Sequence, residues 1–262
     1  MNKKNQRMNR LISNLRIRKT AMVRDLAEEM GVSDMTVRRD LNELVNNHIV
    51  ERSHGRAIFI QDDSAPVFEN IESIYNLSYA SNIMSEEKRR IAKYAATLVE
   101  PNEVIIIDNG STTDKVPDYL PMDMQMTVVC YNLNIIIKLY KNDKIKLILA
   151  GGYFHPSDQI FESAESMLLL KSIRANKLFI SASGVHQTLG MTCAHTFEVL
   201  IKQTVLESSL KKILLADSGK FGAVKTVFFS SIDKLDMIIT DTGLSPEWVE
   251  FIRNMGIELV MV

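Results

Sequence analysis

The segment from Met30 to Leu41 constrains the fold most, because it predicts a sharp turn followed by an amphipathic helix. Gly31 can adopt the positive φ that a turn between two helices requires, and Ser33 is a good N-cap residue. Apolar residues then recur at the spacing of one buried helical stripe: Val37, Leu41, Leu44 and Val45. Residues 23–30 predict a preceding helix. The pair is typical of a helix-turn-helix, which enters the major groove of DNA.

The flanking sequence favours this interpretation over an ordinary surface hairpin of two helices with solvated arginines. Arg7, Leu11 and Leu15 recur every four residues, which predicts a first helix packed behind the other two. Residues 49–52 and 57–60 predict two short strands joined by the turn from Ser53 to Arg56. Three helices followed by a small hairpin predict a winged helix-turn-helix.

We expect this module to bind double-stranded operator DNA through the second helix of the motif and the tip of the wing. The candidate contact residues are Ser33, Met35, Thr36, Arg38, Arg39, Asn42, His54 and Arg56. Which arginine contacts phosphate and which contacts base edges is left open at this point.

Charge is divided unevenly along the chain. Residues 1–60 hold 12 Lys and Arg against 7 Asp and Glu, whereas the rest of the 262 residues hold 19 against 25. A basic N-terminal part followed by an acidic remainder is typical of a protein that binds phosphate groups through one module only. Chance clustering of solvated charge is the alternative explanation. The length suffices for two modest domains.

The two cysteines, Cys130 and Cys193, are far apart and lack the spacing of metal ligands. They predict small buried side chains in a reducing compartment, with no disulfide framework and no metal site. No apolar run approaches the roughly 20 residues that span a bilayer. No secretory signal is visible either. We therefore expect a cytoplasmic protein with no cofactor and no membrane partner.

Hydrophobic periodicity is lost between residues 61 and 85, which predicts a linker between domains at 1–60 and 86–262. Seven apolar runs beyond it predict strands that are covered on both faces: 104–108, 127–130, 146–150, 178–181, 212–216, 237–240 and 257–260. Segments such as 133–141 and 197–210 predict crossover helices between them. The fold class is therefore α/β, with an N-terminal winged helix-turn-helix and a mostly parallel C-terminal sheet flanked by helices.

Small and polar residues follow three of the predicted strands, at 108–113, 151–155 and 182–186. Ligands of a parallel sheet collect at the carboxyl ends of its strands. Gly110 permits a close approach of the backbone, and the hydroxyls that follow it, with free amides, can hold a phosphate. Each loop alone indicates only a tight turn, but the three together favour a small anionic ligand.

The motifs together resemble the DeoR family of bacterial transcriptional regulators. The N-terminal part of the resemblance is Arg7-x3-Leu11-x3-Leu15 followed by Ser33-x2-Thr36-Val37-Arg38-Arg39-Asp40-Leu41, although Arg56 stands where the family usually has a second glycine of the wing. The C-terminal part consists of Asp108-x-Gly110-Ser111-Thr112-Thr113, Asn132-Leu133-Asn134, Gly151-Gly152, Ser183-Gly184, Glu198-x3-Lys202 and Asp217-Ser218-x-Lys220-Phe221.

This resemblance implies a sensor domain similar in fold to ribose-5-phosphate isomerase. It implies that the loop at 110–113 holds a sugar phosphate group and that Asp108, Glu198 and Lys202 face the sugar hydroxyls. The implied effector-binding residues are Asp108, Gly110, Ser111, Thr112, Thr113, Asn132, Gly151, Gly152, Ser183, Gly184, Glu198, Lys202 and Lys220. Further segments, such as 86–90, 95–101 and 184–186, resemble one family member more closely. They imply deoxyribose 5-phosphate or a near relative as the effector. The segment around His195 does not match it.

Three classes of function remain at this stage. The first is a homo-oligomeric repressor that responds to a phosphorylated sugar and has no catalytic residues. The second is an isomerase-like enzyme, because acidic residues and a lysine near a phosphate could transfer protons. The third is a helix-turn-helix used only for protein contacts. The N-terminal module favours the repressor, because a metabolic enzyme has no use for it.

Overall fold

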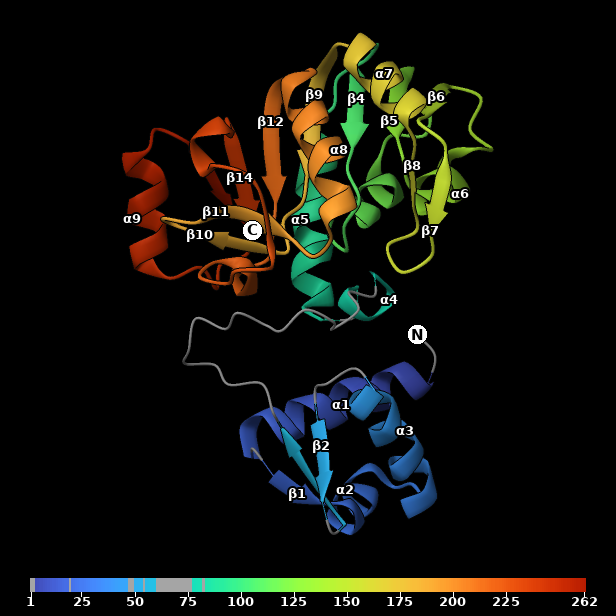
Figure 1. Cartoon of the computed structure of the whole chain (residues 1–262), viewed down its shortest axis with the longest axis vertical. Helices are drawn as coiled ribbons and strands as arrows, with labels where there is room; N and C mark the ends of the chain where they lie inside the picture. The colour runs from blue at the N-terminus through green and yellow to red at the C-terminus, as the bar shows by residue number, and fades with distance from the viewer. Residues whose placement is uncertain (1–2, 19, 47–49, 54, 60–76, 82) are drawn as a thin grey trace. The chain divides into compact units, whose positions relative to one another are not determined.

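The computed structural model describes residues 3–18, 20–46, 50–53, 55–59, 77–81 and 83–262. The chain divides into two compact units, Met1–Ile74 and Tyr75–Val262, which are drawn in Figure 1 and treated separately below. Most of the predicted linker at 61–85 lies outside the described residues. Its described part begins at Leu77 and belongs to the second unit.

The first unit contains three helices and three short strands. In chain order they are α1 (Lys3–Arg18), β1 (Thr20–Met22), α2 (Val23–Met30), α3 (Asp34–Asn46), β2 (Val50–Ser53) and β3 (Arg56–Phe59). The strands form an antiparallel sheet in the order β1-β3-β2. The predicted two-stranded wing is thus corrected to a three-stranded sheet. Sequence reasoning missed β1 because three residues are too few to display an alternating pattern.

The core of this unit is the apolar stripe that the sequence predicted. Leu11 and Leu15 of α1 and Val37, Leu41 and Leu44 of α3 are all buried, whereas Val45, the fourth residue of the predicted stripe, is half-buried. The helical spacing of both sets places them on one face of each helix. The remaining faces of α3 are therefore free to carry polar groups.

The second unit is built on a seven-stranded parallel sheet in the order β15-β14-β12-β9-β4-β5-β6. Each strand overlaps one of the predicted apolar runs: β4 (Val104–Ile107), β5 (Met126–Cys130), β6 (Ile145–Leu149), β9 (Ala175–Ile180), β12 (Ser209–Leu215), β14 (Met237–Thr240) and β15 (Glu258–Met261). The prediction of a mostly parallel sheet is confirmed. Because all seven strands run in one direction, their carboxyl ends meet at one edge.

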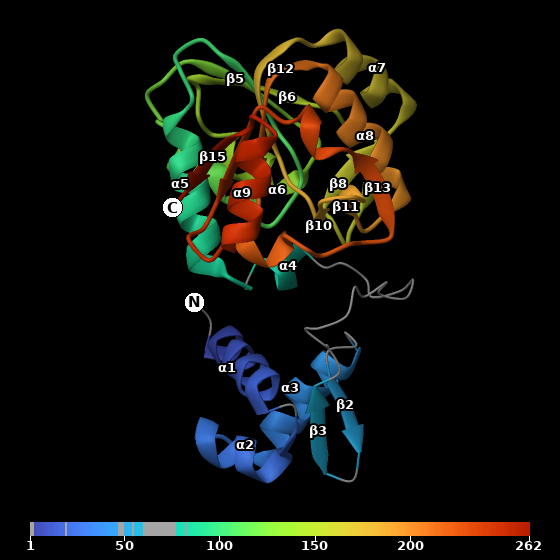
Figure 2. The same ribbon diagram turned by 90° about the vertical axis from the view of Figure 1, so that its left-hand side faces the viewer.

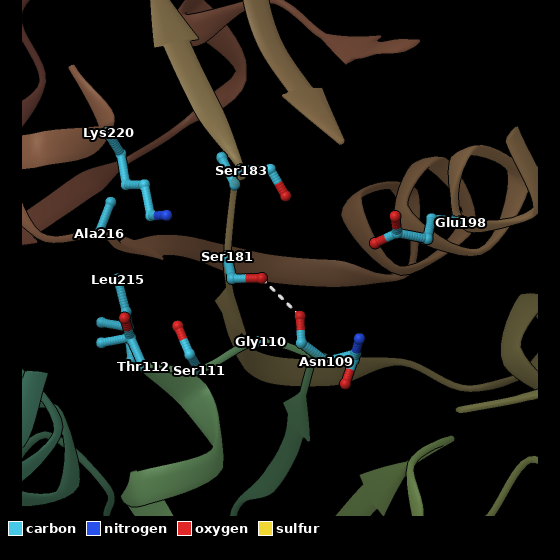
Figure 3. A pocket seen from close by; sticks show the side chains of 11 residues that line it. Asn109, Gly110, Ser111, Thr112, Ser181, Ser183, Glu198, Leu215, Ala216 and Lys220 are labelled. Carbon is cyan, nitrogen blue, oxygen red and sulfur yellow. Dashed lines mark hydrogen bonds between the residues drawn. The ribbon is translucent and has the colours of Figure 1, made fainter. Parts of the chain in front are cut away.

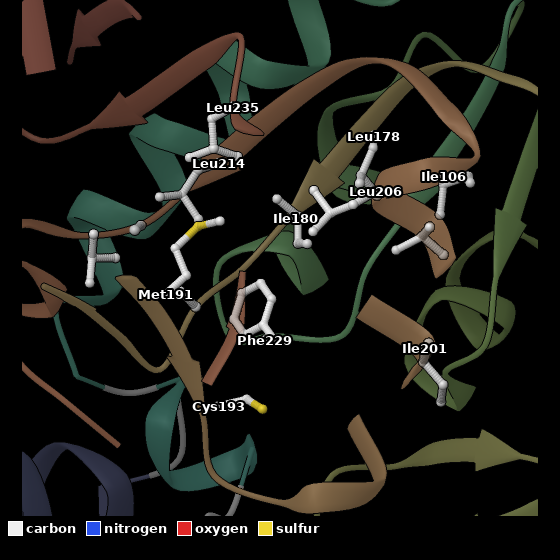
Figure 4. Packing of buried hydrophobic residues seen from close by; sticks show 14 of the residues in the cluster. Ile106, Leu178, Ile180, Met191, Cys193, Ile201, Leu206, Leu214, Phe229 and Leu235 are labelled. Atoms are coloured by element: carbon white, nitrogen blue, oxygen red, sulfur yellow. The ribbon is translucent and has the colours of Figure 1, made fainter. Parts of the chain in front are cut away.

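Helices cover both faces of this sheet (Figures 1 and 2). Side chains alternate along the strands, so Ile105 and Ile107 join a core with α5 and α6, whereas Ile106 joins a core with α7, α8 and α9. Figure 4 shows Ile106, Leu178 and Leu206 in the latter core. The helices are α4 (Leu77–Ala80), α5 (Ser85–Thr97), α6 (Leu133–Leu139), α7 (Ala164–Ser172), α8 (Thr196–Glu207) and α9 (Pro246–Asn254).

Two small antiparallel sheets lie outside the main sheet, and sequence reasoning treated parts of both as loops. One is the hairpin of β7 (Tyr153–His155) and β8 (Ile160–Glu162). The other joins β10 (Gly184–His186), β11 (Gly190–Cys193) and β13 (Val227–Ser230). Their strands of three or four residues are too short to be recognised from alternation, so the loops predicted at 151–155 and 182–186 each contain a strand.

Candidate functional site

The turn before α3 has the geometry of a helix-turn-helix. Gly31 ends α2 with a φ of +64°, in the left-handed region where glycine is favoured. Ser33 precedes α3, and its Oγ accepts a hydrogen bond from the amide of Thr36 at 3.3 Å. The predicted turn and the predicted N-cap are both confirmed, and together they fix the direction in which α3 leaves the turn.

The predicted DNA-contact residues of α3 lie on its open face. Arg38, Arg39 and Asn42 are exposed, as is Ser33, while Thr36 is half-buried. Met35 is 74% exposed, which is unusual for a large apolar side chain in a unit with its own core. Arg56 is exposed at the start of β3, and the predicted contact His54 lies outside the described residues. This face offers cations, polar groups and one apolar contact.

A partly buried ion pair ties α3 to α1. Arg7 Nε donates to Asp40 Oδ2 at 2.5 Å, and the Asp40 side chain is fully buried. The hydrogen bond to Asp40 raises the pKa of the Arg7 guanidinium above its ordinary value. The two ends of the N-terminal motif in the sequence therefore meet in space, and the pair fixes the orientation of α3 relative to α1.

The second unit has a pocket at the carboxyl ends of β4, β9 and β12 (Figure 3). Its lining residues are Asn109, Gly110, Ser111, Thr112, Ser181, Ala182, Ser183, Glu198, Leu215, Ala216 and Lys220. Six of these were predicted from the sequence, and they come from four separate segments. The predictions missed Asn109, Ser181, Ala182, Leu215 and Ala216. All five follow or end predicted strands, so position at a strand end was the available signal.

One side of the pocket is suited to an anion. The backbone amides of Gly110, Ser111 and Thr112 donate to no acceptor among the described residues, and neither do the hydroxyls of Ser111, Thr112 and Ser183. A Cβ at Gly110 would lie 2.3 Å from Ser181 Oγ, so only glycine lets this loop lie against β9. Unpaired N–H groups on a curved loop form an anion-binding site.

Lys220 is the lysine that lines the pocket, and its charge acts on the buried Lys88. The Lys88 ammonium lies 3.2 Å from Asp217 Oδ2 and donates to the carbonyl oxygens of Ala80 and Ile83. Burial lowers the pKa of Lys88 to about 8, with Lys220 and Lys115 adding to the effect, and burial also lowers the pKa of Lys115. Lysines that repel one another in this way favour a bound anion.

Asp108 is turned away from the pocket into a buried network. Its Oδ1 accepts from the Tyr131 hydroxyl, and its Oδ2 accepts from the amide of Ser181 at 2.8 Å and from Lys202 Nζ at 2.6 Å. Burial lowers the pKa of Lys202, but the charges of Asp108 and Glu198 outweigh it and the pKa is raised overall. Of the three residues predicted to face sugar hydroxyls, Asp108 and Lys202 are thus bonded to protein partners and do not line the pocket.

Glu198 is the buried carboxylate that does line the pocket. It lies in the first turn of α8, where its Oε1 accepts the amide of His195 at 3.0 Å. Burial is the main reason that its pKa rises to about 7, and the charge of Asp158 adds to the shift. In Figure 3, Glu198 and Lys220 lie on opposite sides of Ser181.

The other predicted effector-binding residues do not line the pocket. Thr113 Oγ1 donates to the carbonyl of Gly110, and Asn132 Nδ2 donates to the carbonyl of Asp108. Gly184 begins β10, where a Cβ would lie 2.5 Å from the carbonyl oxygen of Ala223. Gly151 and Gly152 follow β6, two strands from β4 in the sheet. Their contribution is to the shape of neighbouring elements.

The comparison with protein families assigns both units. Residues 7–63 match the DeoR-like helix-turn-helix domain, and residues 83–242 match the DeoR C terminal sensor domain. The chain belongs to the DeoR family. This assignment favours a DNA-binding transcriptional regulator over the isomerase-like enzyme that was the alternative from sequence.

Named relatives of this DeoR-family chain match along nearly its whole length. The deoxyribose operon repressor of Escherichia coli strain K12 is 32% identical over 98% of each chain. The HTH-type transcriptional regulator IolR of Bacillus subtilis is 29% identical over 92% of this chain and 93% of its own. The chain is thus similar to these regulators in both units.

Among solved structures, similarity is weaker. Ribose 5-phosphate isomerase A from Methanocaldococcus jannaschii gives a TM-score of 0.38 at 16% identity, covering 52% of this chain and 54% of that one. A probable sor operon regulator from Shigella flexneri gives 0.42 at 11% identity, covering 60% and 85%. Both scores are below 0.5, so neither likeness bears on the site.

The described residues contain no group of three or more acidic, histidine or cysteine side chains placed to hold a metal ion. None of the helices in that part of the chain has the length and apolar character needed to cross a membrane.

Proposed function

We propose that this DeoR-family regulator represses a sugar catabolic operon and releases its operator when a phosphorylated sugar occupies the pocket of the second unit. The observation that carries the proposal is the set of unpaired amides at Gly110, Ser111 and Thr112 facing a pocket that Lys220 lines. The similarity to a deoxyribose operon repressor supports deoxyribose 5-phosphate or a near relative as the effector.

The pocket has chemistry suited to both ends of such a molecule. The anion side at the 110–112 loop would take the phosphate, because N–H groups and lysines favour negative charge. Glu198 and Asn109 would take sugar hydroxyl groups, since both carry buried oxygen acceptors. Asp108 and Lys202 would support this pocket from behind by fixing the end of β4 to β9.

The segment that precedes α5 gives the effector a route to the rest of the chain. The Lys88 ammonium donates to Ala80 O at 2.9 Å and to Ile83 O at 2.7 Å, and it is also paired with Asp217. Asp217 lies three positions before the pocket residue Lys220. A phosphate bound at Lys220 would add negative charge near Lys88. This charge would compete with Asp217 for the Lys88 ammonium and so alter its hydrogen bonds to Ala80 and Ile83.

The proposal includes assembly into a homo-oligomer. A single winged helix offers one small basic face, which is too little for tight specific binding, whereas two heads on a symmetric oligomer can read a repeated half-site. By linkage, if the effector lowers the affinity for operator by some factor, the operator lowers the affinity for the effector by the same factor. Calorimetric titration of deoxyribose 5-phosphate with and without operator would measure both effects.

The test is a thermal-shift screen of the full chain against deoxyribose 5-phosphate, ribose 5-phosphate, glucose 6-phosphate and inorganic phosphate. A sugar phosphate at about 100 times its Kd should raise the Tm of the second unit by about 5–10 °C. Lys220→Met should abolish the shift. Lys211→Met, at the opposite end of β12, is the matched control and should preserve it. No shift with any sugar phosphate would refute the proposal.

The DNA side is tested with operator fragments selected from random duplexes by the full chain. The selected sites should contain repeated half-sites, and deoxyribose 5-phosphate should release them in a gel-shift assay. Selection of sites that no sugar phosphate releases would contradict the inducer mechanism while leaving DNA binding intact.

A further inference from the structure

A second polar cluster lies beside Glu198, away from the anion side. The turn between β7 and β8 contributes Asp158, and the residue before α8 contributes His195. Hydrogen bonds hold this turn against the end of β5: the amide of Leu133 donates to the carbonyl of Gln159 at 2.8 Å, and the amide of Phe161 donates to that of Tyr131 at 2.7 Å. Segments far apart in sequence therefore converge next to the pocket.

The cluster is unusual because its polar atoms are buried without partners. Asp158 is fully buried, and its Oδ1 has no hydrogen-bond partner among the described residues, whereas its Oδ2 accepts from Ser157 Oγ at 2.6 Å. His195 Nε2 likewise has no hydrogen-bond partner among those residues, and its one charged neighbour is Asp158 Oδ2 at 3.5 Å. The Oδ1 atoms of Asn109 and Asn132 are unpaired as well.

Buried polar atoms that lack a hydrogen-bond partner destabilise the folded state. Native proteins therefore leave few of them, and the four at Asn109, Asn132, Asp158 and His195 require an explanation. Asn109 lines the pocket, and Glu198 lines it while bonded to the His195 amide. His195 is thus connected to the pocket through Glu198, and Asp158 through His195. A polar ligand with several hydroxyl groups would satisfy them.

The imidazole of His195 is held in place by aromatic stacking. Phe197 stacks on His195 with ring centroids 4.9 Å apart and on His155 with centroids 3.9 Å apart. The ring planes of His195 and Phe197 are only 10° from parallel. A ring fixed in this way presents its nitrogen in one direction without losing further rotamer freedom, which favours a binding role.

We propose that Asp158 and His195 form, together with Glu198, a subsite for the hydroxyl-bearing end of the effector. This inference rests on the proposed function, because it takes the phosphate to lie at the 110–112 loop. The carboxylate of Asp158 accepts from a sugar hydroxyl, and His195 Nε2 forms a hydrogen bond with a second hydroxyl. The subsite distinguishes a sugar phosphate from a phosphate that lacks hydroxyl groups at its far end.

The experiment measures the affinities of deoxyribose 5-phosphate and of inorganic phosphate for the full chain by calorimetry. Where phosphate binding releases too little heat, its affinity is obtained from its competition with deoxyribose 5-phosphate. Asp158→Asn removes the charge at nearly constant shape. His195→Phe keeps the stack on Phe197 and removes the ring nitrogens. Each substitution should lower the affinity for deoxyribose 5-phosphate about tenfold or more and leave the affinity for inorganic phosphate within about twofold of the wild-type value.

Asp236→Asn is the control, because Asp236 precedes β14 at the opposite edge of the sheet and is exposed. It should leave both affinities unchanged. The two test variants act on different side chains, so a folding defect in one leaves the other informative.

Wild-type affinity for deoxyribose 5-phosphate in both Asp158→Asn and His195→Phe would overturn the subsite while leaving the proposed function standing. An equal loss of deoxyribose 5-phosphate and inorganic phosphate would also overturn it, because the cluster would then act on the pocket as a whole. Failure of the wild-type chain to bind deoxyribose 5-phosphate would instead count against the proposed function.

Discussion

Burial of the Glu198 carboxylate makes the stability of the second unit depend on pH. Its pKa is about 7 in the folded chain, against an ordinary value of 4.5. The folded state therefore binds more protons than the unfolded state between these values, and stability falls as pH rises through them. At about 1.4 kcal/mol per pKa unit, this group lowers the free energy of unfolding by about 3 kcal/mol between pH 4.5 and pH 8.

Glu198→Gln tests this because glutamine has the same shape, keeps an oxygen to accept the His195 amide and does not ionise. The variant should gain about 2.5 kcal/mol relative to wild type on going from pH 5 to pH 8. The free energy of unfolding is measured by urea titration at several pH values. The readout is the fluorescence of Trp248, the single tryptophan, which lies in α9. Burial also raises the pKa of Asp158, so only the difference between variant and wild type is diagnostic.

Glu165→Gln is the matched control, because Glu165 lies in the first turn of α7 as Glu198 does in α8, but is exposed. Its unfolding free energy should follow the wild-type pH profile. Parallel profiles for Glu198→Gln and wild type between pH 5 and pH 8 would refute the reasoning.

Three further predictions concern both units. Arg38→Ala combined with Arg39→Ala should abolish gel shifts of selected operator at moderate salt while changing the free energy of unfolding by less than about 1 kcal/mol, since both residues are exposed. Asp108→Asn should lower the free energy of unfolding in urea by about 3–5 kcal/mol, because it leaves the buried Lys202 ammonium without its paired charge. Gly110→Ala should abolish the thermal shift by deoxyribose 5-phosphate, because the added methyl group forces the anion-binding loop away from β9.

The controls for these predictions separate binding from folding. Arg253→Ala removes an exposed arginine from the second unit and should leave the gel shift intact. Retained operator affinity in the double arginine variant would remove α3 from the DNA interface. An Asp108→Asn chain of wild-type stability that no longer responds to deoxyribose 5-phosphate would restore Asp108 as a direct ligand contact. A Gly110→Ala chain with a full thermal shift would show that the loop tolerates the methyl group.

Local sequence predicted the elements of both units well. The stripe of Val37, Leu41 and Leu44 identified α3, because a helical period of apolar residues requires only neighbours in sequence. Continuous apolar runs identified the seven sheet strands for the same reason. Strands of three or four residues, such as β1 and β10, were missed because they are too short to carry a period.

The pocket shows what such reasoning could and could not reach. Position at a strand end singled out Gly110, Ser111 and Thr112, which line the pocket, and their binding of a phosphate stays a prediction. The same logic, with the resemblance, placed Asp108 toward the ligand, whereas its carboxylate faces Lys202, 94 positions later in the chain. Which way a side chain at a strand end turns depends on the partner that the neighbouring strand and helix supply.

The sequence by itself determined the helix-turn-helix, the run of parallel strands and the edge of the sheet where a ligand would bind, because these follow from local periodicity and from the direction of the strands. Only the tertiary structure decided which polar residues at that edge pair with one another and which keep atoms without a hydrogen-bond partner. Asp108 and Lys202 neutralise each other in the interior, while Asp158 and His195 are brought together from separate segments with atoms left unsatisfied. That difference depends on distances between residues far apart in the chain, which no local pattern encodes.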